Sequence, residues 1–278
     1  MKSTFKVTFW GVRGSIPVPG PQTTKYGGNT PCVEVRCADQ LFVFDTGSGV
    51  VSLGRKLLSE GPLLGHIFYT HFHWDHIQGF PFFAPLFNPA NQFHLYGQHN
   101  TPHTLEKALG GQMEQPVFPI TIKHLPATLH FHQVCESVPL EIGPVKISPF
   151  KLNHPSPCLG YRLDFEGRSM VYGADNEHGA DGLHQVYLDH ARDADLVIFD
   201  AAYTDEEYTG HKGPPRKNWG HSTATHALDL LQHPGAKRVA LFHHDYLRTD
   251  QELTAIETNI QQRHPEIFCA REGMTLEL

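Results

Sequence analysis

The sequence predicts an α/β fold in a single domain that covers residues 1–278. Short apolar runs typical of strands alternate along the chain with segments typical of helices. No internal repeat, low-complexity tract or linker divides the 278 residues, and a chain of this length commonly forms one domain. The composition, with 40% hydrophobic and 18% charged residues, is that of a globular protein.

The first half of the chain is rich in strand patterns. Strands are expected at residues 5–10, 32–37, 41–44, 66–70 and 93–97, and a helix from about residue 50 to 60. Residues 77–87 are strongly apolar, and we interpret them as a core helix interrupted by Pro81 and Pro85, with a hydrophobic wall or dimer patch as the alternative. Residues 98–128 hold many Pro and Gly and at most a short helix, which makes them a candidate for a mobile cover.

The second half continues the alternation. Strands are expected at residues 145–150, 159–163, 169–175, 196–200 and 238–242, and helices at 224–232 and 250–262. Ser222 or Thr223 could cap the first of these helices. Residues 201–221 form a long polar loop, and residues 268–278 are expected to add an edge strand.

Charge and composition exclude several classes of protein. The net charge of −7 argues against a broad nucleic-acid surface, which needs a basic face, although a local basic patch stays open. No apolar run is long enough for a transmembrane helix, and residues 1–6 lack the apolar core of a signal peptide. The five Cys are odd in number and scattered, as expected for free thiols in a reducing cytoplasm.

Residues 71–76 carry the strongest chemical signal. Four potential metal ligands, His71, His73, Asp75 and His76, directly follow the apolar run 66–70. Side chains repeat every two residues in a strand, so His71 and His73 point the same way at its end. A turn into a helix would then carry Asp75 and His76 to a neighbouring position. Imidazole and carboxylate suit zinc, and also manganese or iron. A surface turn that happens to hold histidines is the alternative.

Further ligands are expected where other strands end. His154 follows the strand at 145–150, and its context fits a third imidazole for one metal. Asp175 ends the strand at 169–175, where one carboxylate can bridge two metals. The strand at 238–242 runs into His243 and His244, of which one would complete the second metal site. Six histidines between residues 94 and 132 have no ligand-like spacing and are interpreted as structural or surface residues: His94, His99, His103, His124, His130 and His132.

These motifs resemble the metallo-β-lactamase superfamily. The Asp-x-Gly turn at 45–47, the hexad at 71–76, Gly-His-Ser-Thr at 220–223 and Leu-Phe-His-His-Asp at 241–245 look like its ribonuclease Z and cyclic phosphodiesterase branch. The resemblance spans residues 11–245. It implies a four-layer αββα sandwich, a two-metal site at one edge of the two sheets, and a homodimer for which residues 80–87 could supply the patch.

The resemblance also implies roles for individual residues. Two divalent metal ions, Zn²⁺ or Mn²⁺, would be held by His71, His73 and His154 in one set, and by Asp75, His76 and His243 in the other. Asp175 would bridge the two sets. Asp75 and His221 are the candidate catalytic residues. His221 corresponds to the family histidine that contacts the scissile phosphate and can protonate the leaving group. Asp45 would brace the metal loop, with N-capping of the next helix as the alternative role.

The expected reaction is hydrolysis of a small or cyclic phosphodiester by a metal-bridging hydroxide. Lys212, Arg216 and Lys217 could bind its phosphate, although a solvated loop is the alternative. Ribonucleases Z that process tRNA carry a basic arm, whereas residues 98–128 contain only Lys107 and Lys123 and no Arg. Ribonuclease Z-like RNA processing is therefore an alternative. The others are a lactonase, thioesterase or β-lactamase on the same fold, a non-catalytic metal-binding scaffold, and a diiron redox protein.

Overall fold

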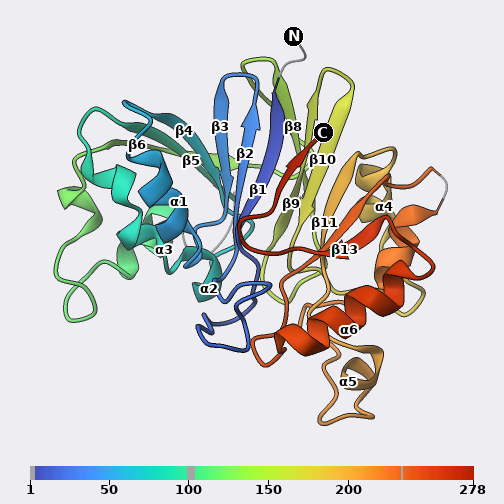
Figure 1. Cartoon of the computed structure of the whole chain (residues 1–278). Coiled ribbons are helices and arrows are strands. Elements are labelled where there is room, and N and C mark those ends of the chain that lie inside the picture. The colour runs from blue at the N-terminus through green and yellow to red at the C-terminus, as the bar shows by residue number, and fades with distance from the viewer. Residues whose placement is uncertain (1–3, 99–103, 233) are drawn as a thin grey trace.

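Two seven-stranded sheets face each other in the computed structural model, which describes residues 4–98, 104–232 and 234–278 (Figure 1). The first sheet has the order β14-β1-β2-β3-β4-β5-β6, and the second has the order β13-β12-β11-β10-β9-β8-β7. In each sheet four neighbouring strands pair antiparallel, from β14 to β3 and from β7 to β10. The remaining neighbours pair parallel, from β3 to β6 and from β10 to β13.

The strand boundaries follow the apolar runs of the sequence. The first sheet contains β1 (Phe5–Gly11), β2 (Cys32–Cys37), β3 (Gln40–Phe44), β4 (Leu64–Phe68), β5 (Gln92–Gln98), β6 (Thr128–Val134) and β14 (Thr275–Glu277). The second sheet contains β7 (Leu140–Ile142), β8 (Val145–Lys151), β9 (Leu159–Phe165), β10 (Arg168–Gly173), β11 (Leu196–Asp200), β12 (Val239–Phe242) and β13 (Ile267–Cys269). The C-terminal segment thus adds one edge strand to each sheet rather than a single strand.

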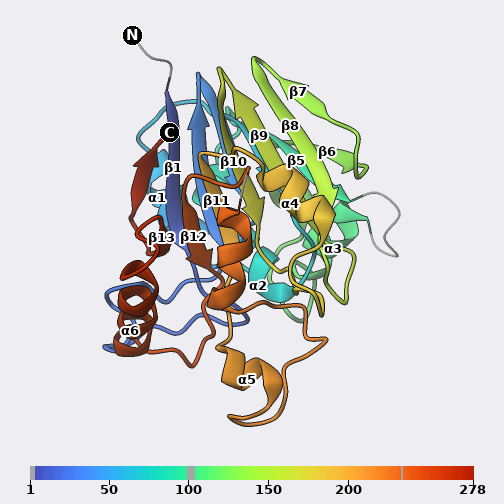
Figure 2. The same ribbon diagram turned by 90° about the vertical axis from the view of Figure 1, so that its right-hand side faces the viewer.

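Helices lie outside each sheet, so that the fold has four layers: the helices on the first sheet are at the left in Figure 1, and one helix on the second sheet lies in front of it in Figure 2. The α-helices are α1 (Val50–Leu57), α2 (Trp74–Ile77), α3 (Leu105–Gly111), α4 (Gln185–Ala191), α5 (Asp205–Thr209) and α6 (Asp250–Gln261). The 3₁₀ helices are η1 (Phe80–Phe82), η2 (Ala84–Phe87), η3 (Ile122–His124) and η4 (Ala224–Leu231).

Three buried apolar clusters hold the layers together. One fills the space between the sheets, one packs the first sheet against α1, α3 and the turns after α2, and one packs the second sheet against α4, η4 and α6. Full burial of a Val, Leu, Ile, Phe or Met side chain contributes about 1.5–3 kcal/mol to the free energy of folding. The predicted four-layer αββα sandwich is confirmed. No helix within the described residues is long and apolar enough to span a membrane.

The prediction of a core α-helix at residues 77–87 is wrong in the type of helix. The chain forms the single turn α2 and then the 3₁₀ helices η1 and η2, because Pro81 and Pro85 cannot donate the backbone hydrogen bonds of an α-helix. Phe80 and Phe83 are fully buried, whereas Phe82 is 58% exposed. The segment is therefore core on one side and apolar surface on the other.

Three other helical predictions need correction. Residues 224–231 form a 3₁₀ helix, in which hydrogen bonds close three residues back, as from the amide of His226 to the carbonyl of Thr223. Thr223 does not cap this helix, because its hydroxyl donates to Asp205 instead. The polar loop contains α5. Segment 98–128, the candidate for a mobile cover, contains α3 and η3, and its mobility stays a prediction; residues 99–103 lie outside the described residues.

Candidate active site

Loops at the ends of parallel strands gather the polar residues predicted from the sequence. β3 leads to Asp45, β4 to the hexad at 71–76, β10 to Asp175, and β12 to His243. Because neighbouring parallel strands end at the same edge of their sheet, these loops meet there, and ligand sites of α/β folds commonly lie at such edges. His154 arrives from the antiparallel strand β8.

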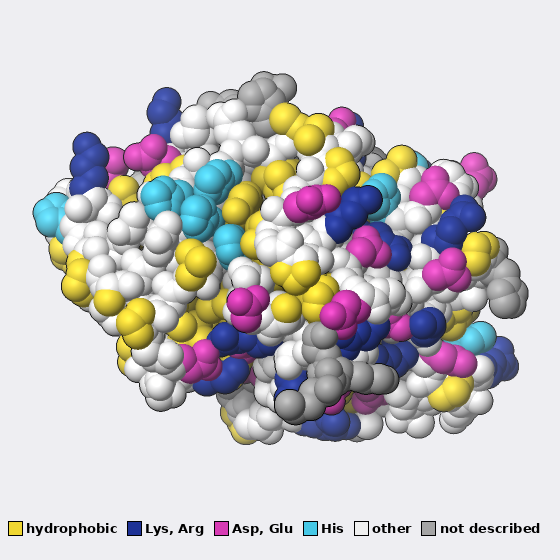
Figure 3. Space-filling view, turned by 90° about the horizontal axis from the view of Figure 1, so that it is seen from above, with side chains coloured by type: hydrophobic (Ala, Val, Ile, Leu, Met, Phe, Trp, Pro, Cys, Tyr) yellow, Lys and Arg dark blue, Asp and Glu magenta, His cyan; other side chains and the backbone are white. Residues whose placement is uncertain are grey.

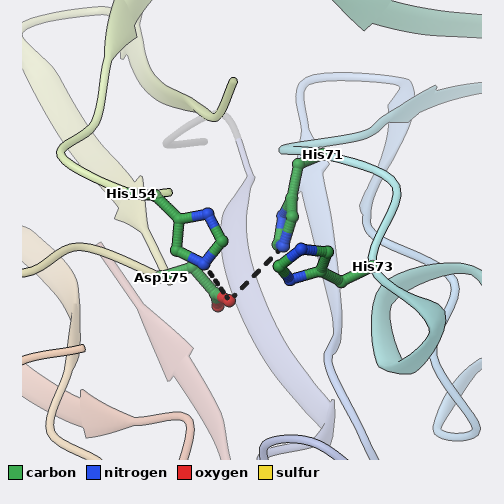
Figure 4. Close-up of side chains that lie close together, drawn as sticks. All are labelled: His71, His73, His154 and Asp175. Atoms are coloured by element: carbon green, nitrogen blue, oxygen red, sulfur yellow. Dashed lines mark ion pairs between the residues drawn. The ribbon is translucent and has the colours of Figure 1, made fainter. Parts of the chain in front are cut away.

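Asp175 joins two groups of side chains. One of its carboxylate oxygens, Oδ2, lies 3.5 Å from Nε2 of His71 and 3.7 Å from Nε2 of His154 (Figure 4). The other oxygen, Oδ1, lies 3.2 Å from Nε2 of both His76 and His243. One buried carboxylate therefore faces two separate sets of imidazoles with its two oxygens.

The first group consists of His71, His73, His154 and Asp175, whose nitrogen and oxygen atoms lie close enough together to hold one cation. The ring centroid of His71 is 4.4 Å from that of His73 and 4.7 Å from that of His154, in edge-to-face arrangements. Nε2 of His73 forms a 2.8 Å hydrogen bond with the hydroxyl of Ser156. These contacts arrange three imidazoles around one side of Asp175.

The second group consists of Asp75, His76 and His243. Oδ2 of Asp75 lies 3.4 Å from Nε2 of His76 and 3.2 Å from Nε2 of His243. The same oxygen accepts a 2.8 Å hydrogen bond from the amide of Ser15. The structure therefore brings together all seven residues predicted as ligands.

Asp45 orients His76 from behind. Oδ2 of Asp45 accepts a 2.8 Å hydrogen bond from Nδ1 of His76 and a 2.9 Å bond from the hydroxyl of Tyr172. Its Oδ1 accepts from the amide of Thr70 at 2.9 Å. The bond at Nδ1 leaves Nε2 of His76 to face Asp75 and Asp175. Carboxylates commonly orient metal-binding histidines by accepting a hydrogen bond from the other ring nitrogen in this way. N-capping, the alternative role for Asp45, is wrong, because α1 has Gly49 at its N-cap.

Three residues at this site adopt the left-handed backbone conformation, which is uncommon for residues other than glycine. They are Asp45, Asp175 and His243, with φ values of 57°, 59° and 55°. Such conformations are costly and cluster at functional sites. A glycine also shapes the site: a Cβ at Gly14 would lie 2.3 Å from Cε1 of His243, so only glycine lets residues 11–15 pass this close to the ring.

The buried polar atoms of the cluster fit divalent cations. Nε2 of His71, Nε2 of His76 and Oδ1 of Asp175 are buried and make no hydrogen bond within the described part of the chain. Buried polar atoms without partners are rare in proteins and costly. Burial opposes a charged imidazole, yet the carboxylates of Asp175, Asp75 and Asp45 raise the pKa of His76 well above its usual value. The site therefore favours positive charge at this position, and imidazole with carboxylate is a ligand set for Zn²⁺ or Mn²⁺.

His221 lies beside the two groups. Its Nδ1 donates a 2.7 Å hydrogen bond to Oδ2 of Asp200, and its ring stacks on His243 with centroids 4.7 Å apart. Burial lowers the pKa of His221, but the charge and hydrogen bond of Asp200, together with the charges of Asp175 and Asp75, outweigh burial and raise it to about 9. Without bound metal, the His221 ring therefore favours its protonated form at neutral pH. Asp175, Asp200, His221 and His243 also lie close enough together to hold a cation, although the direct bond to Asp200 occupies Nδ1 of His221.

Glu177 holds the loop that carries His221. Its buried carboxylate accepts hydrogen bonds from the hydroxyl of Tyr208 at 2.7 Å, the amide of Asn218 at 2.7 Å and the amide of Gly220 at 2.9 Å. Gly220 packs so closely on His154 that a Cβ would lie 2.3 Å from Cδ2 of its ring. Glu177 thus ties the loop after β10 to the loop before His221.

The three cations predicted to bind phosphate lie on the 205–221 loop, outside the two groups. Nζ of Lys212 is 4.0 Å from Oε1 of Glu207, at the surface. The guanidinium of Arg216 lies 4.5 Å from the ring centroid of Trp219. Lys217 is exposed and lines a cavity together with His154. A contact of any of them with substrate remains a prediction.

Sequence reasoning gave no role to Asp200, Glu177 or Tyr172, all of which contact site residues. A signal for Asp200 was present, because it ends the apolar strand β11 just as Asp45 follows β3. Glu177 and Tyr172 give no comparable signal. Their roles depend on loops and strands that only the folded chain brings together.

Histidines outside the cluster form a separate stack. Rings of His94 on β5 and His130 on β6 stack with centroids 4.7 Å apart, and Nδ1 of His94 is hydrogen-bonded to Nε2 of His132 at 2.8 Å. Histidine side chains also gather on part of the surface seen in Figure 3. His94, His130 and His132 are therefore structural or surface residues, as predicted, whereas His99 and His103 lie outside the described residues.

Comparisons with known proteins agree with the observed fold. Residues 41–244, more than half of the chain, match the family model described as "Beta-lactamase superfamily domain". The ribonuclease Z of Pyrococcus furiosus is 22% identical over 86% of this chain and 85% of its own length. The metallo-β-lactamase fold protein YhfI from Bacillus subtilis superposes with a TM-score of 0.72 at 19% identity, covering 99% of this chain and 100% of that one. A diphosphatase from the PhnP family superposes with a TM-score of 0.70 at 21% identity, covering 99% and 98%. The protein therefore belongs to the metallo-β-lactamase superfamily of metal-dependent hydrolases and is similar to its ribonuclease Z-like branch.

Proposed function

We propose that the protein is a phosphodiesterase that hydrolyses a small or cyclic phosphodiester at a two-metal centre. The observation that carries this proposal is the position of Asp175, whose two oxygens face two separate sets of ligands. Two-metal sites that cleave phosphate esters hold their ions about 3.5–4 Å apart, a spacing that one bridging carboxylate can span.

Each ligand set would hold one ion. His71, His73 and His154 would bind the first, and Asp75, His76 and His243 the second, with Asp175 shared. When bound, two divalent ions lower the pKa of a water molecule and offset charge on the phosphoryl oxygens. Asp75, held by the amide of Ser15, would orient the attacking water as well as bind metal.

His221 would act as the general acid. Its Nδ1–H is bound to Asp200, which leaves Nε2 to protonate the leaving oxygen of the substrate. Asp200 favours the protonated ring and fixes its orientation. Protonation of a leaving group by a positioned side chain typically contributes about 10²–10⁴-fold to the rate.

Charge favours a small substrate over a long nucleic acid. The chain has a net charge of −7. A broad contact with RNA phosphates needs a concentrated basic surface. RNA processing is the second candidate, and the similarity to the ribonuclease Z of Pyrococcus furiosus favours it.

A substrate panel tests the proposal. The purified protein, loaded separately with Zn²⁺ and Mn²⁺, is assayed on bis(p-nitrophenyl) phosphate, cyclic nucleotides, precursor tRNA, a lactone, a thioester and a β-lactam. We expect turnover of the small phosphodiesters, lost in an Asp175→Ala variant that serves as the control for contaminating activity. Turnover of only the lactone, thioester or β-lactam would overturn the proposal. Efficient tRNA cleavage that falls steeply with salt would favour RNA processing instead.

A further inference from the structure

A cavity of about 900 Å³ adjoins the first ligand group. His154 contributes to both, so the cavity begins where the proposed metal centre ends. Its other walls come from the loop after β10, the 205–221 loop and the start of η4, and include His178, Tyr208, Lys217 and His226. The volume lies in the range of about 300–1,000 Å³ found for small-molecule sites.

Flat rings form one wall of this cavity. The rings of His178 and His226 stack with centroids 3.5 Å apart and an interplanar angle of 14°. The ring of Tyr208 lies 4.2 Å from that of His178 on centroids. Such a wall offers stacking surface to a planar ligand, and stacking on side-chain rings is how proteins commonly bind nucleic-acid bases.

Polar atoms of the same residues are available to a ligand. His178 is only 7% exposed, and its one hydrogen bond within the described residues is a long 3.4 Å contact from Nδ1 to the hydroxyl of Ser222. His226 uses Nδ1 on the hydroxyl of Thr223 at 3.0 Å. Nε2 of each ring has no partner among the described residues. Burial lowers the pKa of His178 to about 4, so its ring is neutral and can donate or accept according to its tautomer.

The two carboxylates in the walls are already engaged. Glu177 accepts its three hydrogen bonds from the loop, and Asp205 accepts from the hydroxyls of Thr223 and Thr225. Lys217 makes no ion pair within the described ranges and is the one cation that lines the cavity there. One ammonium beside neutral rings and amides offers little positive charge to hold a second phosphate. This mixture of donors and acceptors fits a heterocycle that carries both donors and acceptors.

We propose that this cavity binds the heterocyclic base of a nucleoside whose phosphodiester is cleaved at the neighbouring metal centre. The proposal rests on the proposed function and narrows its substrate class to nucleoside phosphodiesters. The base lies against the rings of His178, Tyr208 and His226, and Nε2 of the two imidazoles pairs with its edge. His154, at the border of cavity and metal group, lies on the side of the phosphate.

Binding of adenosine tests the cavity without any catalysis. Its dissociation constant is measured by equilibrium dialysis with the full-length protein, both metal-loaded and treated with a chelator. We expect His226→Ala to weaken binding about tenfold through loss of stacking. Ala180→Trp, which fills the cavity from the loop after β10, should abolish binding with every ring left in place. His190→Ala is the matched control, because His190 is also a partly buried, ring-stacked histidine but lies outside the cavity.

Turnover distinguishes this proposal from the proposed function. In both cavity variants we expect KM to rise for 2′,3′-cyclic AMP and to stay unchanged for a base-free diester such as cyclic ethylene phosphate. A protein that hydrolyses both diesters but binds no adenosine would overturn the cavity assignment and leave the phosphodiesterase intact. Adenosine binding that both variants retain would also overturn it. Adenosine binding lost in both variants, with no phosphodiester hydrolysed, would support the cavity while overturning the phosphodiesterase.

Discussion

Nδ1 of His221 and Oδ2 of Asp200 are joined by a 2.7 Å hydrogen bond beside the proposed metal centre. This bond fixes which ring nitrogen is free, because an imidazole that donates from Nδ1 presents Nε2 to the opposite side. It also sets the charge state of His221. In the proposed function, Asp200 therefore prepares His221 to act as the general acid rather than as a further metal ligand.

The pH dependence of catalysis should follow this pair. The pKa of His221 in the folded chain is raised to about 9 from the usual histidine value of about 6.5, so the protonated form dominates at pH 7 and is lost as pH rises through about 9. The stability that the pair contributes is fully present below about pH 6.5 and disappears over the same rise. We expect kcat to fall above pH 9 in the wild type, and Asp200→Asn to move this decline toward pH 7 with metal content unchanged. A pH–rate profile that does not change in Asp200→Asn would contradict the role of Asp200.

The dependence of the reaction rate on the leaving group should show whether His221 donates a proton to it. We expect His221→Ala to retain both metals and to lose about 10²-fold or more in rate on cyclic nucleotides, whose ribose alkoxide needs protonation. The loss on bis(p-nitrophenyl) phosphate should be smaller, because p-nitrophenolate is a good leaving group. If His221 only holds its loop, both substrates should suffer equally and the melting temperature should fall.

Replacing each of the two adjacent histidines after β12 should have different effects on activity and bound metal. Nε2 of His243 lies 3.2 Å from Asp75 and from Asp175, whereas Nε2 of His244 donates to the carbonyl of Ala270 at 3.0 Å. We expect His243→Ala to abolish activity and reduce bound metal. His244→Ala should keep the metals and lose stability by about 1–3 kcal/mol, since it leaves a buried carbonyl without its donor. Denaturant melts and metal analysis of the two variants check this, and the reverse pattern would reassign the ligand.

The Glu177 carboxylate should matter to catalysis through loop position. In Glu177→Gln the amide nitrogen would face a backbone N–H, which leaves Asn218 or Gly220 without an acceptor. We expect about a tenfold fall in kcat with both metals retained, and faster amide hydrogen exchange at Asn218 or Gly220. Glu206→Gln is the matched control, because Glu206 is an exposed carboxylate on α5 with no side-chain bond among the described residues. Exchange that is unchanged at both Asn218 and Gly220 in all three proteins would refute the role of Glu177 in holding this loop.

The sequence was informative where apolar strands end on ligands. β3, β4, β10 and β12 each contain an apolar run near their C-terminal end, so their ends could be located and the polar residues that follow could be grouped. β6 was missed because its alternate positions are His130 and His132, which obscure the alternation of a half-buried strand. The α4 helix was missed as well.

Contacts between loops could not be predicted. The pairing of His221 with Asp200 joins residues that are 21 positions apart, and Tyr172 reaches Asp45 across 127 positions from the facing sheet. No periodic pattern specifies such pairs, because they depend on how the two sheets stack. The left-handed conformations of Asp45, Asp175 and His243 occur in residue types that adopt them more often than most, yet no local pattern marks these three positions in the sequence.

Titration of the metal-free protein with Zn²⁺ or Mn²⁺ tests the two-metal phosphodiesterase centre most directly. Activity on bis(p-nitrophenyl) phosphate is followed against metal equivalents per chain, and bound metal is measured on the same samples. We predict that activity rises until two equivalents are bound, and that Asp175→Ala loses both. Full activity at one equivalent, or unchanged activity in the chelated protein, would contradict the two-metal centre.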